Sequence, residues 1–497
     1  MTIVVTLWWL AFWTALGLIV GSFLNAVIYR LPRRHSLRVP LWSACPHCRH
    51  RIALYDNVPI LSFLLLRGRC RNCGVPIGTR YVVIEATMAL IVLMLIDAFM
   101  IAGARSGLRN SEFGLTDALS FDWPILLAHV ILFACLLAMS AVDLEHYWVD
   151  IRFTNFVTVA GFILHTVWTP PHSADWPRPG DTTAVASIFA LFGLGFVWII
   201  LASQQPVAEP LNEETPEPHA ELSDEAVRPR RPPPSLMSPS RGAGWVAVGL
   251  LLGTFVVLVV CEGWHVPIRH AGRALIPLGF LFALIISEST VARDSDQAIV
   301  EAIHEERHGA RGMVLKELAL LLPAVLLGCL GLVLMLKVPE FADRVHQILH
   351  VSVSFPSVDV LRSWQPLHGF STAAAGFVVA GALGWAIRIL FTLAFGKEAF
   401  GTGDIHLMAA AGCVAGWPVV VLAFFLTCAI SLLGWLATLP FKRTRALPLG
   451  PWLSLSFLIV VIFYDPISRW GPIRNAVTVA RWVFLENSQP LPDDGAP

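Results

Sequence analysis

Four cysteines in one arginine-rich stretch have the types and spacing that indicate metal chemistry. They form two Cys-x-x-Cys pairs, Cys45 with Cys48 and Cys70 with Cys73, and 21 residues separate the pairs. Two such pairs can present four thiolates tetrahedrally to one zinc ion. Two disulfides are the alternative, which a reducing cytosolic face disfavours. Four-cysteine sites are normally closed and non-catalytic, so we expect zinc to shape this loop.

Two aspartates next to apolar segments indicate a second kind of chemistry. Asp143 follows the apolar run LLAMSAV, and Asp404 ends the sequence Gly401-Thr-Gly403-Asp404, directly before a short apolar helix. Glycines let the backbone approach closely and place the carboxylate at a helix N-terminus. Two facing carboxylates in a partly dry site share a proton, so one acts as base toward water and the other as acid toward a peptide carbonyl. The alternative is a helix cap and a helix-end charge.

The composition indicates the elements that must position these residues. Of the 497 residues, 56% are hydrophobic and 14% are charged, against about 45–50% and about 25% in soluble domains. The apolar residues form long blocks, which predicts a polytopic membrane protein. A soluble enzyme, a disordered chain and a disulfide-knit secreted domain are excluded. Basic and acidic residues balance at 35 each, so no basic field indicates nucleic acid.

Apolar blocks of about 20 residues, the length that spans a bilayer, predict about twelve transmembrane helices. Gly416-Trp-Pro418 divides the long block 404–440 into a short helix and a full one. The predicted helices lie near 5–28, 81–101, 124–142, 153–168, 183–202, 243–262, 274–289, 313–337, 370–395, 404–416, 418–440 and 447–465. The single cysteines inside these blocks, which we interpret as buried packing residues, are Cys135, Cys261, Cys329, Cys413 and Cys428.

Charge asymmetry predicts the orientation of the helices. The stretch from Arg30 to Arg80 contains ten arginines and one acid, Asp56, so the positive-inside rule places it in the cytoplasm. Alternating from there places Asp143 and Asp404 at the same cytoplasmic face. The expected organisation is a first transmembrane helix (1–28), a cytoplasmic four-cysteine loop (29–80), helices with the first aspartate (81–168), an inserted region (169–390) with a disordered linker (204–242), helices with the second aspartate (391–465) and a C-terminal tail (466–497).

Several motifs in this order resemble the type IV prepilin leader peptidases, a family of membrane aspartyl proteases with a Gly-x-Gly-Asp motif. The residues that carry the resemblance are Gly21-Ser-Phe-Leu-Asn-Ala-Val-Ile-Tyr-Arg-Leu-Pro32, the two cysteine pairs, Tyr55-Asp-Asn-Val-Pro-Ile-Leu-Ser62, Leu66-Arg-Gly-Arg-Cys70, Arg80-Tyr81, Glu85, Asp143-Leu-Glu145, Gly401-Thr-Gly-Asp404 and Leu447-Pro-Leu-Gly-Pro-Trp452. They cover roughly 1–165 and 390–465.

The resemblance implies a peptidase of the bacterial inner membrane that removes the leader of prepilins or pseudopilins after a glycine, at the cytoplasmic face. Asp143 and Asp404 would be the catalytic pair. Many family members also N-methylate the new N-terminus with S-adenosylmethionine. The expected partners are therefore these substrates, membrane lipid and the pilus or type II secretion machinery.

The chain departs from the family pattern at three places. Trp148-Val149-Asp150 lacks the usual proline before its aspartate, and His406 replaces the usual lysine. An insert at 170–390 separates the two aspartates. We interpret Asp150, His406 and Glu85, with Gly401 and Gly403, as candidates to support the catalytic pair.

Two other functions remain open. His304-Glu305-Glu-Arg-His308 fits the His-Glu-x-x-His pattern of zinc proteases, although it lies in a highly charged segment with no obvious third ligand. Alternatively, the chain is a non-catalytic membrane scaffold of a pilus or secretion machine that retains the zinc loop.

Overall fold

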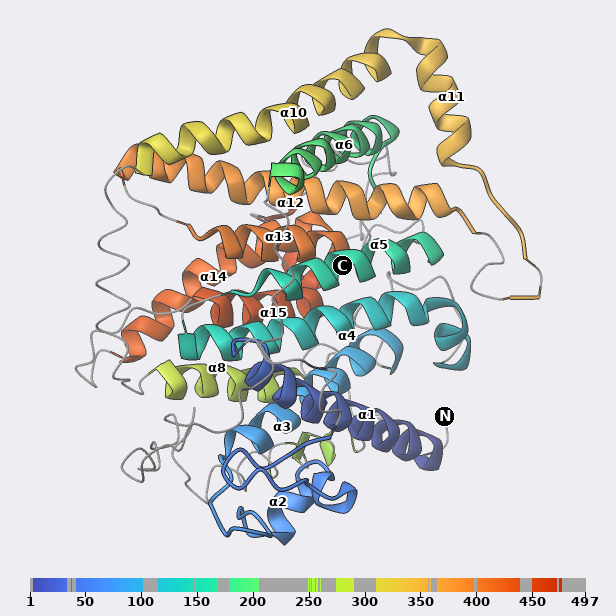
Figure 1. Cartoon of the computed structure of the whole chain (residues 1–497). Coiled ribbons are helices and arrows are strands. Elements are labelled where there is room, and N and C mark those ends of the chain that lie inside the picture. The colour runs from blue at the N-terminus through green and yellow to red at the C-terminus, as the bar shows by residue number, and fades with distance from the viewer. Residues whose placement is uncertain are drawn as a thin grey trace.

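The computed structural model is a bundle of helices that lie side by side, with a small loop domain around α2 at one edge (Figure 1). It describes residues 3–33, 37, 42–101, 115–146, 149–168, 178–204, isolated positions within 249–260, 274–289, 310–355, 357–358, 364–396, 400–438, 449–471 and 473–475. Within these residues every regular element is helical, which confirms the predicted all-α class. The α-helices are α1 (Ile3–Arg30), α2 (Leu61–Leu65), α3 (Arg80–Ile96), α4 (Leu115–His146), α5 (Ile151–Val167), α6 (Asp181–Gln204), α8 (Leu275–Ser289), α10 (Ala310–Lys337), α11 (Pro339–Leu349), α12 (Pro366–Phe395), α13 (Thr402–Ala415), α14 (Trp417–Thr438) and α15 (Leu449–Arg469).

The chain is a multi-pass membrane protein. Eight of the described helices are long and apolar enough to cross a bilayer, and Ile151–Val167 and Pro277–Ile286 are shorter apolar helices. The predicted division at Gly416 is confirmed, because α13 ends at Ala415 and α14 begins at Trp417. Gly416 has a φ of 84° there, a conformation that favours glycine. The predicted helix at 243–262 lies largely outside the described residues.

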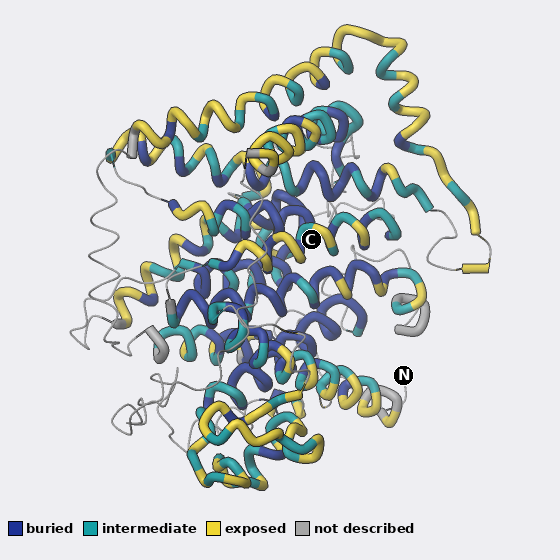
Figure 2. Tube along the Cα trace, in the orientation of Figure 1, coloured by how far each residue is buried: buried dark blue, intermediate teal, exposed yellow. Residues whose placement is uncertain are grey.

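The core of the bundle consists of α3, α4, α13 and α15, which Figure 2 shows as mostly buried. All of the apolar window of α3 is buried, and so is 78% of the window of α4. Large side chains from separate helices, including Met88, Phe133 and Phe457, belong to one continuous apolar cluster. The helices that carry the two aspartates, α4 and α13, are therefore part of the tightly packed apolar core.

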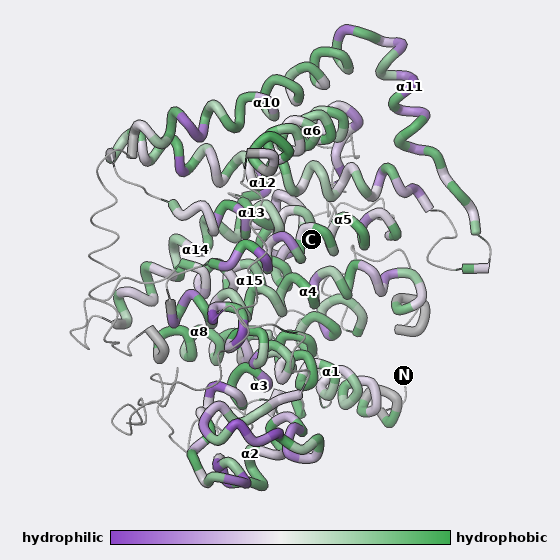
Figure 3. The backbone as a smooth tube through the Cα atoms, in the orientation of Figure 1, coloured by the Kyte–Doolittle hydropathy of each residue, from purple (hydrophilic) through white to green (hydrophobic). Residues whose placement is uncertain are grey.

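The inserted region adds helices at one edge of this core. In Figure 1, α6 and α10 lie beyond α12, and α6 packs along α10. Only 11% of the apolar window of α10 is buried, although the helix is strongly hydrophobic (Figure 3). In a multi-pass protein, an apolar helix surface that other helices leave exposed faces lipid. By contrast, Figure 3 shows hydrophilic segments in the loop around α2 and along α11.

The single cysteines are only partly as predicted. Cys135 and Cys413 are buried, but Cys329 and Cys428 are exposed at the surface of their helices. The interpretation as buried packing residues is wrong for these two, because an apolar segment faces lipid as readily as protein and its composition does not distinguish the two. Cys261 lies outside the described residues.

The helices α12 and α13 cross with backbones almost in contact. A Cβ atom added to Gly376 would lie 2.0 Å from the carbonyl oxygen of Gly412, and one added to Gly412 would lie 2.3 Å from that of Gly376. Small residues permit this kind of approach between membrane helices. The crossing fixes α13, and with it Asp404, against α12.

We expect Gly412→Ala to destabilise the protein by about 1–3 kcal/mol or more, because the added methyl group overlaps the backbone of α12. Gly195→Ala is the matched control, since its Cβ would meet nothing within 4 Å. Thermal unfolding of the detergent-solubilised chain measures both. Equal melting temperatures for the two variants would contradict this account of the crossing.

Candidate active site and metal centre

The four loop cysteines come together as their spacing predicts. The sulfur atoms of Cys45, Cys48, Cys70 and Cys73 all lie within 4.8 Å of one another. The Sγ atoms of Cys45 and Cys73 are 3.9 Å apart, and four thiolates about 2.3 Å from a zinc ion at the corners of a tetrahedron are about 3.8 Å apart. All four are free cysteines rather than disulfides. The donor set and its spacing therefore fit a structural zinc ion.

Both cysteine pairs have the same backbone turn. The amide of Arg49 donates to the carbonyl of Cys45, and the amide of Gly74 donates to the carbonyl of Cys70 in the same way. Arg49 and Gly74, each four residues after the first cysteine of its pair, have φ values of 57° and 69°. Each turn thus directs its two sulfur atoms toward the same point, as a zinc knuckle does.

The surroundings of the cysteines make their thiols unequal. A hydrogen bond from the backbone amide of His50 lowers the pKa of Cys48 to about 6. Burial raises the pKa of Cys45. A thiolate is the form that binds metal and reacts with alkylating agents, so Cys48 is the more reactive thiol of the first pair.

Contacts from the family-like motifs hold this loop in place. Arg71 donates two hydrogen bonds of 2.7 Å to Asp56, and the hydrogen bond from Arg71 lowers the pKa of the Asp56 carboxyl. The amide of Ile60, whose φ of 58° is unfavourable for a β-branched residue, donates to Glu85 on α3 at 2.8 Å. Glu85 thereby links the loop to the membrane helices.

Asp143 lies near the end of α4 and is buried. The backbone amide of Gly450, at the start of α15, donates to Oδ2 of Asp143 at 3.0 Å. A Cβ atom at Gly450 would lie 2.7 Å from the same oxygen, so this close approach needs glycine. The late motif of the resemblance, which carried no assigned role, thus supplies a hydrogen bond to the first aspartate.

Asp404 lies in the first turn of α13, which packs against α4. The two carboxyl groups are close enough for a direct electrostatic interaction between Asp143 and Asp404. A Cβ atom at Gly401 would lie 3.1 Å from Oδ2 of Asp404, and one at Gly403 would lie 2.8 Å from the Cβ of Val149. The first glycine therefore clears space for the carboxylate, and the second lets α13 approach the segment before α5.

The other candidate residues differ in their surroundings. Asp150 is buried, caps α5 by accepting from the amide of Arg152 at 2.9 Å, and is bridged by the Arg152 side chain. His406 is half-buried on α13, two positions after Asp404. The segment that contains His304, Glu305 and His308 lies outside the described residues.

An ion pair that the sequence did not predict joins the insert to the loop of Asp404. Arg388 on α12 is buried and forms a 2.7 Å ion pair with Glu317 on α10. The guanidinium of Arg388 also donates to the carbonyl of Phe400, directly before Gly401. Because the arginine holds both groups, α10 helps to position the loop that begins α13.

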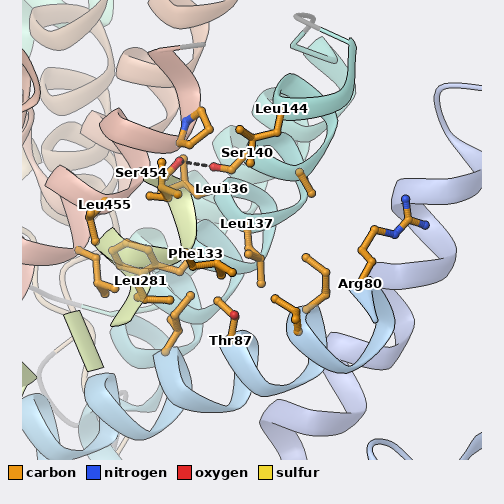
Figure 4. A pocket seen from close by; sticks show the side chains of 18 residues that line it. Arg80, Thr87, Phe133, Leu136, Leu137, Ser140, Leu144, Leu281, Ser454 and Leu455 are labelled. Carbon is orange, nitrogen blue, oxygen red and sulfur yellow. Dashed lines mark hydrogen bonds between the residues drawn. The ribbon is translucent and has the colours of Figure 1, made fainter. Parts of the chain in front are cut away.

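A cavity of about 110 Å³ begins one turn before Asp143 on α4 (Figure 4). Its walls come from α3, α4, α8 and α15 and are mainly apolar. Ser140 on α4 donates to Ser454 on α15 at 2.9 Å. Arg80 lies at its edge and forms a 2.9 Å ion pair with Glu145. On one side of Asp143 a hydrogen bond thus joins α4 to α15, and on the other side an ion pair joins α4 to α3.

Comparisons with known proteins show which sequences this chain resembles. Residues 15–99 match the family model of the bacterial peptidase A24 N-terminal domain. The predicted family resemblance is confirmed. The matched segment includes most of α1, the whole cysteine loop and Glu85.

Curated relatives extend the similarity. The chain is 34% identical over 217 residues to a prepilin leader peptidase/N-methyltransferase of Burkholderia pseudomallei, covering 39% of this chain and 60% of that protein. It is 37% identical over 168 residues to a type 4 prepilin-like proteins leader peptide-processing enzyme of Escherichia coli, covering 30% and 53%. For a prepilin leader peptidase/N-methyltransferase of Vibrio cholerae the identity is 38% over 109 residues, with 19% and 43% covered. The chain therefore spans only about half the length of these relatives. No solved structure matches it.

Removal of zinc with a chelator should expose the loop thiols, and Cys48 should then be alkylated before Cys45 at pH 7. A thiol with a pKa of about 6 is mostly thiolate at pH 7, whereas burial raises the pKa of Cys45. Mass spectrometry of peptides after timed iodoacetamide treatment measures the order. Equal labelling of Cys48 with and without chelator would show that the four cysteines hold no metal.

Proposed function

We propose that this chain is a membrane aspartyl endopeptidase that removes the leader peptide of type IV prepilins or pseudopilins. The observation that carries the proposal is that Asp143 and Asp404 lie near the ends of α4 and α13, two helices far apart in the sequence that pack against each other. The names of the similar proteins, which describe prepilin leader processing, support the substrate class. The arginine-rich loop supports a site at the cytoplasmic face of the bacterial inner membrane.

In this proposal the two carboxyl groups share one proton and activate a water molecule. The Gly450 amide fixes Oδ2 of Asp143, and we assign the other oxygen to the water. Proton transfer from this water to the carboxylate generates the attacking hydroxide, while the protonated partner donates toward the scissile carbonyl oxygen. The zinc ion that fits Cys45, Cys48, Cys70 and Cys73 supplies loop structure.

A second activity follows from the names of the relatives, which include N-methyltransferase. We propose that the new N-terminus is methylated with S-adenosylmethionine as the donor. The mass of the cleaved product tests this directly, because a methyl group on the new N-terminus raises that mass by a fixed amount. The scaffold and zinc-protease alternatives have less support, since the similar proteins are named as leader-processing enzymes.

Asp143→Asn and Asp404→Asn should each reduce leader cleavage by at least about 10²–10⁴-fold, because either change removes an acid or base. Cleavage of a prepilin from the same organism, co-expressed in membranes, is measured by gel shift and N-terminal mass. Asp343→Asn, on the exposed face of α11, is the matched control. Full cleavage by both aspartate variants would disprove the pair, and no cleavage by the wild type would favour the scaffold alternative.

Glu317→Ala should destabilise the chain by about 3–5 kcal/mol, since it leaves the buried Arg388 without its carboxylate. The double variant Glu317→Leu/Arg388→Leu should recover most of that stability and still cleave slowly, because the bond to Phe400 is lost. Lys316→Ala, at an exposed neighbouring position, should change neither property. Thermal unfolding and the cleavage assay separate the two effects, and normal cleavage by the double variant would exclude the positioning role.

A further inference from the structure

Two histidines and an aspartate form a second cluster of possible metal ligands, in the inserted region. Asp181 is the first residue of α6, and His346 and His350 lie on and directly after α11. One oxygen of Asp181 is 2.6 Å from Nδ1 of His346, and the other is 3.1 Å from Nε2 of His350. The ligand atoms of the three residues all lie within 4.8 Å of one another.

Packing of α11 against α6 fixes this geometry. Phe341, Val345 and Leu349 recur every four residues on one face of α11, and they join a small apolar cluster with Ala184 and Val185 of α6. His346 and His350 follow Val345 and Leu349 by one position each, so their side chains lie at the edge of that packed face. The spacing of four residues places the two imidazoles next to each other, with ring centroids 4.5 Å apart and ring planes tilted by 45°.

Adjacent elements support the cluster from the other side. The ring of the buried His368, in the first turn of α12, lies 5.2 Å from that of His350. Val353 and Trp364 pair through two backbone hydrogen bonds, which close the segment between α11 and α12. Asp181 and His350 are thus held by packed elements, whereas 62% of the His346 side chain is exposed. A small ion therefore has access from one side.

We propose that Asp181, His346 and His350 bind a divalent transition-metal ion of the zinc class. Imidazole nitrogens favour zinc, copper and nickel over magnesium or calcium. Two histidines and one carboxylate are a known zinc ligand set, with a fourth position open to water. Metal binding replaces the hydrogen bonds between Asp181 and the histidines, and it fastens α11, and so the connection from α10 to α12, to the start of α6.

This site is distinct from both the cysteine loop and the aspartate pair. His368 lies at the first turn of α12, and the loop to Asp404 follows the other end of that helix. Thirty residues of α-helix, about 45 Å at 1.5 Å per residue, separate these ends. Figure 1 shows α11 at the side of the bundle away from the start of α13. The cluster therefore supplies no ligand to the proposed reaction.

Zinc titration of the purified full-length chain tests the proposal. The cysteine loop is first loaded with zinc, and further binding is then measured calorimetrically. We expect one additional ion per chain, which raises the melting temperature. His346→Ala/His350→Ala should weaken this binding by more than about 100-fold, since changes outside the ligand shell already cost 10–100-fold. Asp343→Asn, on the same helix, should bind as the wild type does.

Several outcomes would overturn the proposal. One is binding of no additional zinc by the wild type, which would identify the cluster as a hydrogen-bonded group without metal. Another is equal binding by the wild type and the double variant. If the double variant does not fold, copper titration of the wild type decides the question, because two coordinated imidazoles give a characteristic nitrogen splitting in its electron paramagnetic resonance spectrum. A copper signal without that splitting would also exclude the site.

Discussion

The close crossing of α12 and α13 is the constraint on which the arrangement of the site depends. The short helix α13 lies in the buried core of the bundle, and it contacts α12 through the backbones of Gly376 and Gly412. With no side chain between them, the two helices have little freedom to slide or rotate. Asp404 begins α13, so its position relative to α4 follows from how the crossing seats this helix. The proposed catalytic pair therefore depends on backbone packing more than one turn away from Asp404.

Several charged groups near the core have a defined hydrogen-bond or ion-pair partner. Asp143 accepts from the Gly450 amide, Arg80 pairs with Glu145, and Arg388 holds both Glu317 and the Phe400 carbonyl. A buried charge without such a partner is costly. These contacts join α3 to α4, α4 to α15, and α10 to α12, so they also specify how the helices pair. The same bonds that permit polar residues in this bundle align the helices that carry the two aspartates.

Features of the fold that depend on local patterns could be predicted from the sequence. Apolar length predicted the helices and the division at Gly416, and the Cys-x-x-Cys spacing predicted a four-sulfur cluster. The contacts that complete the site were not predictable in this way, because they join distant residues: Gly450 is 307 positions from Asp143, and His350 is 169 from Asp181. The four-residue spacing of His346 and His350 was visible in the sequence. Asp181, which completes the proposed ligand set with these two histidines, comes from another helix. The exposure of Cys329 and Cys428 was missed because hydropathy does not distinguish lipid from protein.

Helices α10 and α11 of the insert contact opposite ends of α12, most of which also belongs to the insert. At one end, Glu317 of α10 binds Arg388, which holds the carbonyl before Gly401. At the other end, the cluster on α11 and α6 packs beside His368. The single helix α12, 30 residues long, therefore joins the contacts of α11 to the loop that precedes Asp404. The contacts of α10 and α11 with α12 therefore make the insert part of the scaffold that holds the second aspartate, rather than an appendage beside it.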